Sequence, residues 1–224
     1  GAQSEFQAIA FYVFGIRALR VYDTDPLATA KLVRNLARIG LPGLVVTPCA
    51  STAEAVRGAD IVTTVTADKR HAVILTPEMI VPGMHLNALG GDCPGKTELH
   101  PAILRRPDAR IVVEYAPQTR AEGEIQQLEA DFPVSELADV VGGTRPGRTA
   151  TGEVTIFDSV GFALEDFTVL RAGSEVREAS AVGVMVADLV TRQRTDGLDP
   201  TLFRYDRYIE GKPVRSRYDY SIAG

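Results

Sequence analysis

The chain has 224 residues and a mass of 24.1 kDa, enough for one large domain or two small ones with a sizeable buried core. Its 45% hydrophobic and 24% charged residues exclude collagen-like, low-complexity and mostly disordered chains. The 24 basic and 29 acidic side chains give a net charge of −5, which argues against a general nucleic-acid binder because phosphate contacts need a basic face.

The cysteine count and the hydropathy of the sequence indicate the cellular compartment and the absence of disulfides and membrane spans. Only Cys49 and Cys93 are present, so we expect a reducing compartment, by default the cytoplasm, and no disulfide framework. The apolar stretch 181–190 is short and contains Asp188, and residues 1–6 lack a basic region followed by an apolar run, so neither a membrane span nor a signal peptide is predicted. No metal site is expected, because the three histidines lack paired spacing.

The first third of the chain alternates helical and strand patterns. Apolar residues at helical spacing predict a helix over 2–13, and a short β run follows at 18–23. Asp25 and Pro26 are typical of a helix start, here of a helix that runs to about Ile39. A β run at 44–47 is followed by Ser51 and Glu54 at the spacing of a capping box, which predicts a short helix.

The same alternation continues downstream. Strands are predicted at 59–66, 84–89, 110–115 and 154–157, with helical stretches near 97–104 and 117–129 and a glycine-rich loop at 142–148. One or two helices are expected between 159 and 194. The tail from Leu198 interleaves Arg and Tyr residues, for which a surface arm or subunit contact fits the acidic total charge better than nucleic-acid stacking. This rhythm predicts an α/β fold with a parallel sheet and helices on both faces.

The start of the chain contains part of a dinucleotide fingerprint. Such a fold has a glycine-rich turn before its first helix and an acidic residue about twenty residues later, at the end of the second strand. Gly1, Ala2 and Gln3 open the first helix, where backbone N–H groups would hold a pyrophosphate. Asp23 lies at the matching distance and would bind the ribose hydroxyls, which favours NAD over NADP. A plain helix start and turn aspartate remain the alternative, because part of the glycine signature is absent.

A second glycine-rich run, Gly90 to Thr97, matches the P-loop pattern of NTPases letter for letter and follows a predicted strand. Pro94 removes one backbone donor and Asp92 adds negative charge where phosphate oxygens would lie, so the NTPase interpretation is disfavoured. The other interpretation places the loop at the carboxyl end of a strand, where doubly wound sheets bind ligands. There Asp92 is a candidate base and Lys96 a candidate contact to cofactor or substrate.

Four segments carry a family resemblance: residues 1–8, 63–68, 87–99 and 157–166. Together they resemble the ornithine cyclodeaminase/μ-crystallin family over about residues 1–171, and the Gly-Asp-Cys-Pro-Gly-Lys-Thr run is similar to the cyclodeaminase branch. The resemblance implies a Rossmann-like doubly wound sheet in residues 1–171, followed by a C-terminal helix and an Arg/Tyr-rich tail in residues 172–224.

The resemblance also implies a reaction: L-ornithine is converted to L-proline and ammonia by internal hydride transfer, with NAD bound and recycled. It assigns the acid/base role to Asp92, substrate contact to Asp92 and Val160, and no metal. The cofactor contacts that it implies are Gly1, Ala2, Gln3, Asp23, Thr66, Lys96 and Ser159.

The chain also departs from the family pattern. It lacks the upstream region that carries substrate-binding basic residues, the first strand of the sheet and the first glycine of the fingerprint. A sheet without its central strand exposes two edges, so we expect the tail or a neighbouring copy to cover them and predict a homo-oligomer. The alternatives to the cyclodeaminase are a catalytically silent dinucleotide-binding or oligomeric binding protein of the same family, or an imine reductase.

Overall fold

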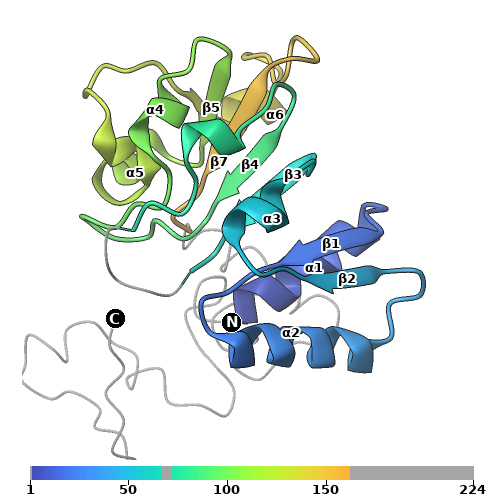
Figure 1. Cartoon of the computed structure of the whole chain (residues 1–224). Helices are drawn as coiled ribbons and strands as arrows, with labels where there is room; N and C mark the ends of the chain where they lie inside the picture. Colours follow the sequence, from blue (N-terminus) through green and yellow to red (C-terminus); the bar gives the residue numbers. More distant parts are fainter. Residues whose placement is uncertain (1, 67–71, 162–224) are drawn as a thin grey trace, which may run out of the picture. The chain divides into compact units, whose positions relative to one another are not determined.

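The computed structural model describes residues 2–66 and 72–161, which belong to one compact unit, Gly1–Gly161. The helices 159–194 and the tail predicted from the sequence, and the predicted boundary at residue 171, lie outside the described residues. Seven strands alternate with short helices in the described part (Figure 1). Among the described residues, none of the helices is long and apolar enough to cross a membrane.

The first part of the chain forms a two-stranded parallel sheet with two helices. Its elements are α1 (Ala2–Val13), β1 (Ala18–Val21), α2 (Pro26–Ile39) and β2 (Val45–Pro48), with β1 paired to β2. The side chain of Asp25 caps α2 by accepting a hydrogen bond from the Leu27 N–H, and Gly40 ends the helix in the left-handed region with φ of 72°. The predicted cap at Ser51 is likewise confirmed: its hydroxyl accepts from the Glu54 N–H at the start of α3 (Thr52–Val56).

The rest of the described chain forms a five-stranded parallel sheet in the order β3-β4-β7-β5-β6. Its strands are β3 (Ile61–Thr64), β4 (His85–Ala88), β5 (Ala109–Val113), β6 (Ser135–Glu136) and β7 (Val154–Asp158). The helices that accompany it are η1 (Pro77–Met79), α4 (Pro101–Leu104), α5 (Ala116–Glu122), η2 (Glu124–Gln127) and α6 (Leu137–Val141). The predicted α/β class with a parallel sheet is confirmed.

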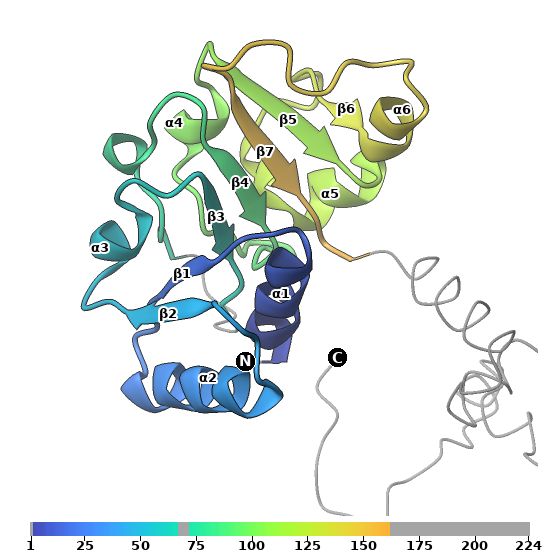
Figure 2. The same cartoon turned by 90° about the vertical axis from the view of Figure 1, so that its right-hand side faces the viewer.

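Two separate hydrophobic cores hold these parts together. The larger packs the five-stranded sheet around residues such as Leu86, Ile103 and Ile156, each 1% exposed or less. The smaller lies under β1 and α2 and contains three buried residues, Ala8, Leu32 and Leu36. In the part of the chain that the structure describes, β1 pairs with β2 and β3 with β4, and the two sheets share no strand (Figure 2). We predicted a sheet without its central strand. In the described residues the strands accordingly form two sheets, and no strand pairs with both β1 and β3.

Three predicted elements need correction. Residues 97–100 are extended, and Leu99 forms a parallel bridge with Leu75, so the helix there is only α4. The helix predicted over 117–129 is interrupted at Gly123, whose backbone is extended, and continues as the 3-10 helix η2. Neither β6 nor α6 was predicted, because two-residue strands and five-residue helices are too short to show a period.

Candidate dinucleotide and catalytic site

The predicted site residues lie in two kinds of place. Some come directly after the carboxyl ends of parallel strands, and the others are the first residues of α1. Doubly wound sheets bind their ligands at this edge. Asp23 follows β1, Thr66 follows β3, Asp92 and Lys96 follow β4, Ser159 and Val160 follow β7, and Ala2 and Gln3 open α1. Gly1 lies outside the described residues.

Asp92, Lys96 and Thr66 lie in direct contact. The Lys96 ammonium donates to the Thr66 carbonyl oxygen at 3.0 Å and to the Asp92 Oδ1 at 3.1 Å. Lys96 is 2% exposed, whereas the Asp92 side chain is 55% exposed. A buried ammonium needs a partner because desolvation disfavours its charge, and Asp92 supplies one. The pair therefore presents an accessible carboxylate above a buried cation.

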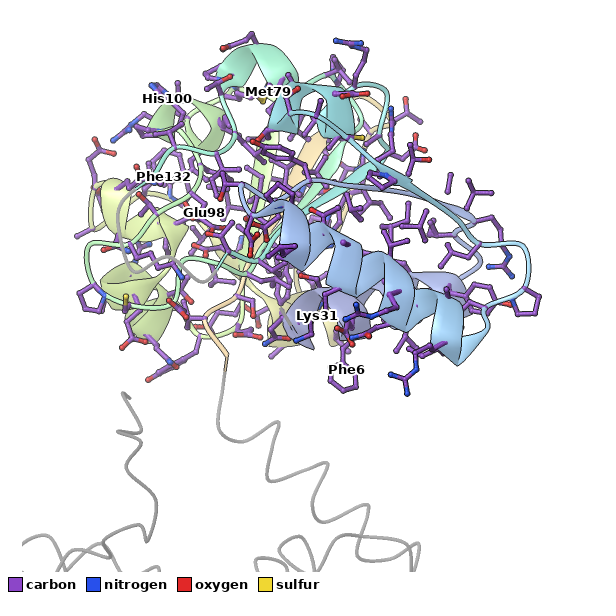
Figure 3. The ribbon with its side chains drawn as sticks, turned by 60° about the horizontal axis from the view of Figure 1, so that its bottom comes forward. Phe6, Lys31, Met79, Glu98, His100 and Phe132 are labelled. Carbon is purple, nitrogen blue, oxygen red and sulfur yellow. The ribbon has the colours of Figure 1, made fainter. Side chains whose placement is uncertain are left out.

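Glu98 is a site residue that the sequence analysis did not identify. It is 1% exposed and lies in the interior of the molecule, in contrast to Phe6 at the surface (Figure 3). Its Oε1 accepts hydrogen bonds from the backbone N–H and the hydroxyl of Thr66. Its Oε2 is buried without a hydrogen-bond partner among the described atoms. Thr66 is thus bound by Glu98 on one side and by Lys96 on the other.

Two more carboxylates are buried behind the loop. Glu124 accepts from the backbone N–H groups of Glu98 and Leu99 at 2.7 and 3.0 Å, and Asp158 accepts from those of Glu124 and Ile125 at 3.0 and 2.9 Å. Both residues are fully buried. Burial raises the pKa of Glu124 to about 8 and that of Asp158 to about 7. The break at Gly123 turns Glu124 inward, into the interior behind the loop.

The loop itself is fastened by one amide side chain. Gln126 accepts from the Gly95 N–H at 2.7 Å and donates to the carbonyl oxygens of Lys96 at 3.0 Å and Cys93 at 3.4 Å. These bonds fix the backbone on both sides of Lys96. The loop that carries Asp92 is therefore held from below by residues of η2, and its exposed tip is left for a ligand.

Ser159 is held by a strand neighbour. Its hydroxyl donates to the Glu114 Oε1 at 2.8 Å, and its N–H donates to the Ala88 carbonyl at 3.1 Å. Because Ala88 ends β4, the bond places Ser159 beside the start of the loop that contains Asp92. Glu114 also accepts from the Gly161 N–H at 3.2 Å, which gives it a role at the strand end rather than in proton transfer.

Asp23 lies on the wall of a cavity of about 310 Å³ between β1 and β3. Thr66 and Ser4 line the same cavity, so the first helix, the end of β1 and the segment after β3 meet there. The Asp23 carboxylate accepts one bond, from the Asp25 N–H at 2.9 Å, and the residue is exposed. An exposed carboxylate in this position can accept hydrogen bonds from a ribose.

The loop 90–97 does not have P-loop geometry. In a P-loop the Lys and Thr open a helix whose N–H groups cradle phosphate, but here no helix begins before Pro101. Lys96 turns inward to the Thr66 carbonyl. The NTPase interpretation therefore lacks both the helix and a phosphate-facing lysine.

Metal ligation finds no support among the described residues, which contain no group of three His, Cys, Asp or Glu side chains that could hold an ion. His85 bonds to Thr155 and Asn87, and burial lowers its pKa. His100 caps α4 through the Ala102 N–H. These contacts give both histidines structural roles.

A parallel sheet of this kind, with helices between its strands and polar side chains after their carboxyl ends, is a Rossmann-like α/β fold. The family model "Ornithine cyclodeaminase/mu-crystallin family" matches residues 1–180. The chain belongs to this family, which confirms the resemblance seen in the sequence.

Individual relatives agree with this assignment. The chain is 60% identical over 172 residues to the ornithine cyclodeaminase of Brucella suis, covering 76% of this chain and 47% of the relative. The iminosuccinate reductase of Paracoccus denitrificans in complex with NAD⁺ is similar in structure, with a TM-score of 0.69 and 31% identity over 80% of this chain and 54% of that one. An archaeal alanine dehydrogenase dimer with bound NAD gives a TM-score of 0.67 and 28% identity over 89% and 58%. The chain spans about half the length of the curated relative.

Proposed function

We propose that the chain is the NAD-binding part of an ornithine cyclodeaminase, which converts L-ornithine to L-proline and ammonia. The observation that carries this proposal is the exposed Asp92 carboxylate on its buried Lys96 partner, in a loop of a chain 60% identical to a named ornithine cyclodeaminase. The structural relatives with bound NAD support the cofactor, and the dimeric one supports a homo-oligomer. Cytoplasmic location and the absence of a nucleic-acid partner remain expectations from composition.

The residues present fit NAD. Asp23 offers an exposed carboxylate on the cavity wall, as ribose hydroxyls require. The twelve-residue helix α1 begins at Ala2 and Gln3, and the free N–H groups at a helix start attract phosphate. The buried Lys96 ammonium donates to the Thr66 carbonyl and to Asp92, so it lies beneath the edge at which the cofactor would bind. Thr66 and Ser159 follow the carboxyl ends of β3 and β7, so both are candidates for contacts with the same ligand.

The protein residues would have separate tasks in this reaction. Bound NAD would supply a hydride acceptor for the substrate α-carbon and then a hydride donor for the cyclic imine. Asp92 accepts a proton from the substrate δ-ammonium, so that a neutral amine is available to attack. Lys96 holds the Asp92 carboxylate in place through their ion pair. Val160 contacts the substrate and excludes water beside it.

The first experiment titrates NAD⁺ and then L-ornithine into the purified chain by calorimetry, with proline and ammonia assayed in the same samples. The proposal expects NAD⁺ to bind, and proline to form where the chain supplies a complete substrate site. NAD⁺ binding without ornithine binding or turnover would show a cofactor-binding part that lacks a complete substrate site, a result that the silent dinucleotide-binding alternative also expects. Reduction of a cyclic imine by NADH without ornithine turnover would favour the imine reductase. Absence of NAD⁺ binding would contradict the proposal.

Asp92→Asn tests the acid/base role. Because general acid–base catalysis contributes about 10²- to 10⁴-fold, we expect proline formation to fall by at least about a hundredfold while NAD⁺ affinity stays within a few-fold. The control is Asp131→Asn, a change at an exposed carboxylate outside the site. Equal activity of the Asp92→Asn variant and the control, both folded by circular dichroism, would assign the proton transfer to another group.

A further inference from the structure

The turn after β7 is held by one carboxylate on both sides of Val160. The Glu114 Oε1 accepts a hydrogen bond from the Ser159 hydroxyl at 2.8 Å, and its Oε2 accepts from the Gly161 N–H at 3.2 Å. Gly161 has a φ of 80°, in the left-handed region that glycine adopts without strain. Because both carboxylate oxygens are used, Glu114 cannot leave Ser159 without also releasing the backbone of the turn.

The contact with Glu114 decides which kind of hydrogen bond Ser159 can offer to a ligand. A hydroxyl has one hydrogen and two lone pairs, whereas an ionised carboxylate has only lone pairs. The single hydroxyl hydrogen of Ser159 therefore points to Glu114, and the Ser159 N–H is used by the Ala88 carbonyl at 3.1 Å. The residue is half-buried, and its hydroxyl oxygen can still accept a hydrogen bond but not donate one.

The neighbouring strand ends have the same polarity. The Thr66 hydroxyl donates to the buried Glu98 Oε1, which also accepts from the Thr66 N–H at 3.2 Å. Lys96, 2% exposed, donates to the Thr66 carbonyl and to the carboxylate of Asp92. Thr66, Asp92 and Ser159 follow β3, β4 and β7, which are neighbours in the sheet. The side chains of these three residues therefore present oxygen lone pairs at the carboxyl edge.

Side-chain oxygens of this kind favour a ligand that carries hydrogen-bond donors. A ligand N–H finds an acceptor there, whereas a ligand carbonyl in the same place faces another oxygen and loses its bond to water without replacement. In NAD the nicotinamide ring carries such a donor, the NH₂ of its carboxamide. In the proposed function hydride passes between this ring and the substrate beside Asp92, and the bond from Ser159 to Ala88 places Ser159 at the start of the Asp92 loop.

We propose that Glu114 is a positioning residue, which fixes Ser159 as the hydrogen-bond acceptor for the carboxamide N–H of the nicotinamide ring. The inference deepens the proposed function and rests on it. Ser159 fixed in this way distinguishes an amide from a ketone on the ring, although both groups have the same carbonyl oxygen. Glu114 thus contributes to cofactor selection through Ser159.

The test compares two dinucleotides in calorimetric titrations of the full chain. The first is NAD⁺, and the second is 3-acetylpyridine adenine dinucleotide, in which a methyl group replaces the amide NH₂ and the carbonyl stays. We expect the parent chain to bind NAD⁺ at least about tenfold more tightly, the effect of one lost hydrogen bond. In Glu114→Ala the freed Ser159 hydroxyl can donate to the carbonyl that both ligands share, so the two affinities should lie within about threefold.

Two further variants complete the comparison. Ser159→Ala removes the acceptor and should lose the same discrimination, which keeps the test decisive if Glu114→Ala does not fold. Glu129→Ala, at an exposed glutamate paired with Arg105, should keep the affinity ratio of the parent chain.

The affinity ratio separates positioning from a merely structural role. A structural effect of Glu114 would weaken both dinucleotides alike, so an unchanged ratio in folded Glu114→Ala, or in Ser159→Ala, would overturn the inference. Equal binding of both dinucleotides by the parent chain would also overturn it, while NAD⁺ binding itself would still support the proposed function. Absence of NAD⁺ binding would contradict the proposed function and this inference with it.

Discussion

Gly90 is confined by the buried carboxylate of Glu98. A Cβ at Gly90 would lie 2.0 Å from Glu98 Oε2, and the Glu98 side chain is fixed by its bonds to Thr66. Because this carboxylate cannot move into solvent, we expect Gly90→Ala to lower the free energy of unfolding by about 3 kcal/mol, in the range of overpacked cores. Urea denaturation measures the change. Gly152→Ala is the control, since nothing lies within 4 Å of its added Cβ, and a similar loss in both variants would contradict the explanation.

At the scale of single residues, the sequence analysis identified the loop residues of the site and did not identify the buried carboxylate that holds Thr66 in place. Asp92 and Lys96 were predicted because they stand in a glycine-rich loop after a strand, a pattern that is local. Glu98 follows two residues later, and only the fold shows that it is buried and bonded to Thr66, 32 residues away in sequence. Long-range hydrogen bonds of this kind leave no periodic signal, so buried carboxylates resemble surface ones in the sequence.

Two buried carboxyl groups lie where η2 meets the end of β7, Glu124 in η2 and Asp158 in β7. Their shifted pKa values predict that the stability of the fold depends on pH. Glu124 and Asp158 have pKa values raised to about 8 and about 7, mainly by burial. Between the ordinary carboxyl pKa near 4 and these values, the folded chain binds protons that the unfolded chain has released. The free energy of unfolding therefore falls as the pH rises through this window, by up to about 1.4 kcal/mol per pH unit for each group.

Glu124→Gln tests this dependence. Urea denaturation between pH 5 and pH 8 should show a shallower decline in the variant than in the parent chain, because one proton-linked group is removed. The lowered pKa of His85 acts in the opposite direction below about pH 6.5 and is common to both chains, so the difference between their slopes isolates Glu124. Asp131→Asn, at an exposed carboxylate, should leave the slope unchanged. Identical slopes in all three chains would mean that Glu124 is not proton-linked to folding.

Elements with clear local signals were predicted closely. The helix α1 matches its predicted bounds, and α2 begins after Asp25 and ends at Ile39, as predicted. The segments after Thr97 and after Gly123 differ from the predicted helices, because contacts with distant parts of the chain determine their conformation. The bridge between Leu75 and Leu99 holds the first extended, and the bonds from Glu124 and Ile125 to Asp158 draw the second inward.

For the molecule as a whole, two cores and two unshared sheets predict stepwise unfolding. We expect Leu36→Ala, which creates a cavity in the small core, to destabilise residues 2–48 by about 2–5 kcal/mol and to leave the five-stranded sheet unchanged. Ile103→Ala, in the large core, should instead destabilise the five-stranded sheet. Hydrogen exchange measured by mass spectrometry separates the two regions. A single transition shifted equally by both variants would show that the cores unfold as one unit.

The break between the sheets was expected from the sequence, because the pattern of strands begins with a helix and lacks the strand that should precede it. The sequence could not show that the remaining strands keep their positions on both sides of the break. That outcome depends on each part having a hydrophobic core of its own, formed by residues that are distant along the chain.

The edges of β1 and β3, which pair with no further strand among the described residues, also have a consequence for the life of the chain in a cell. Unpaired parallel edges beside apolar walls are the features by which unassembled polypeptides aggregate or are captured by chaperones and degraded. A chain in which these edges stay unpaired is therefore expected to have a shorter half-life in a cell than one in which they are paired.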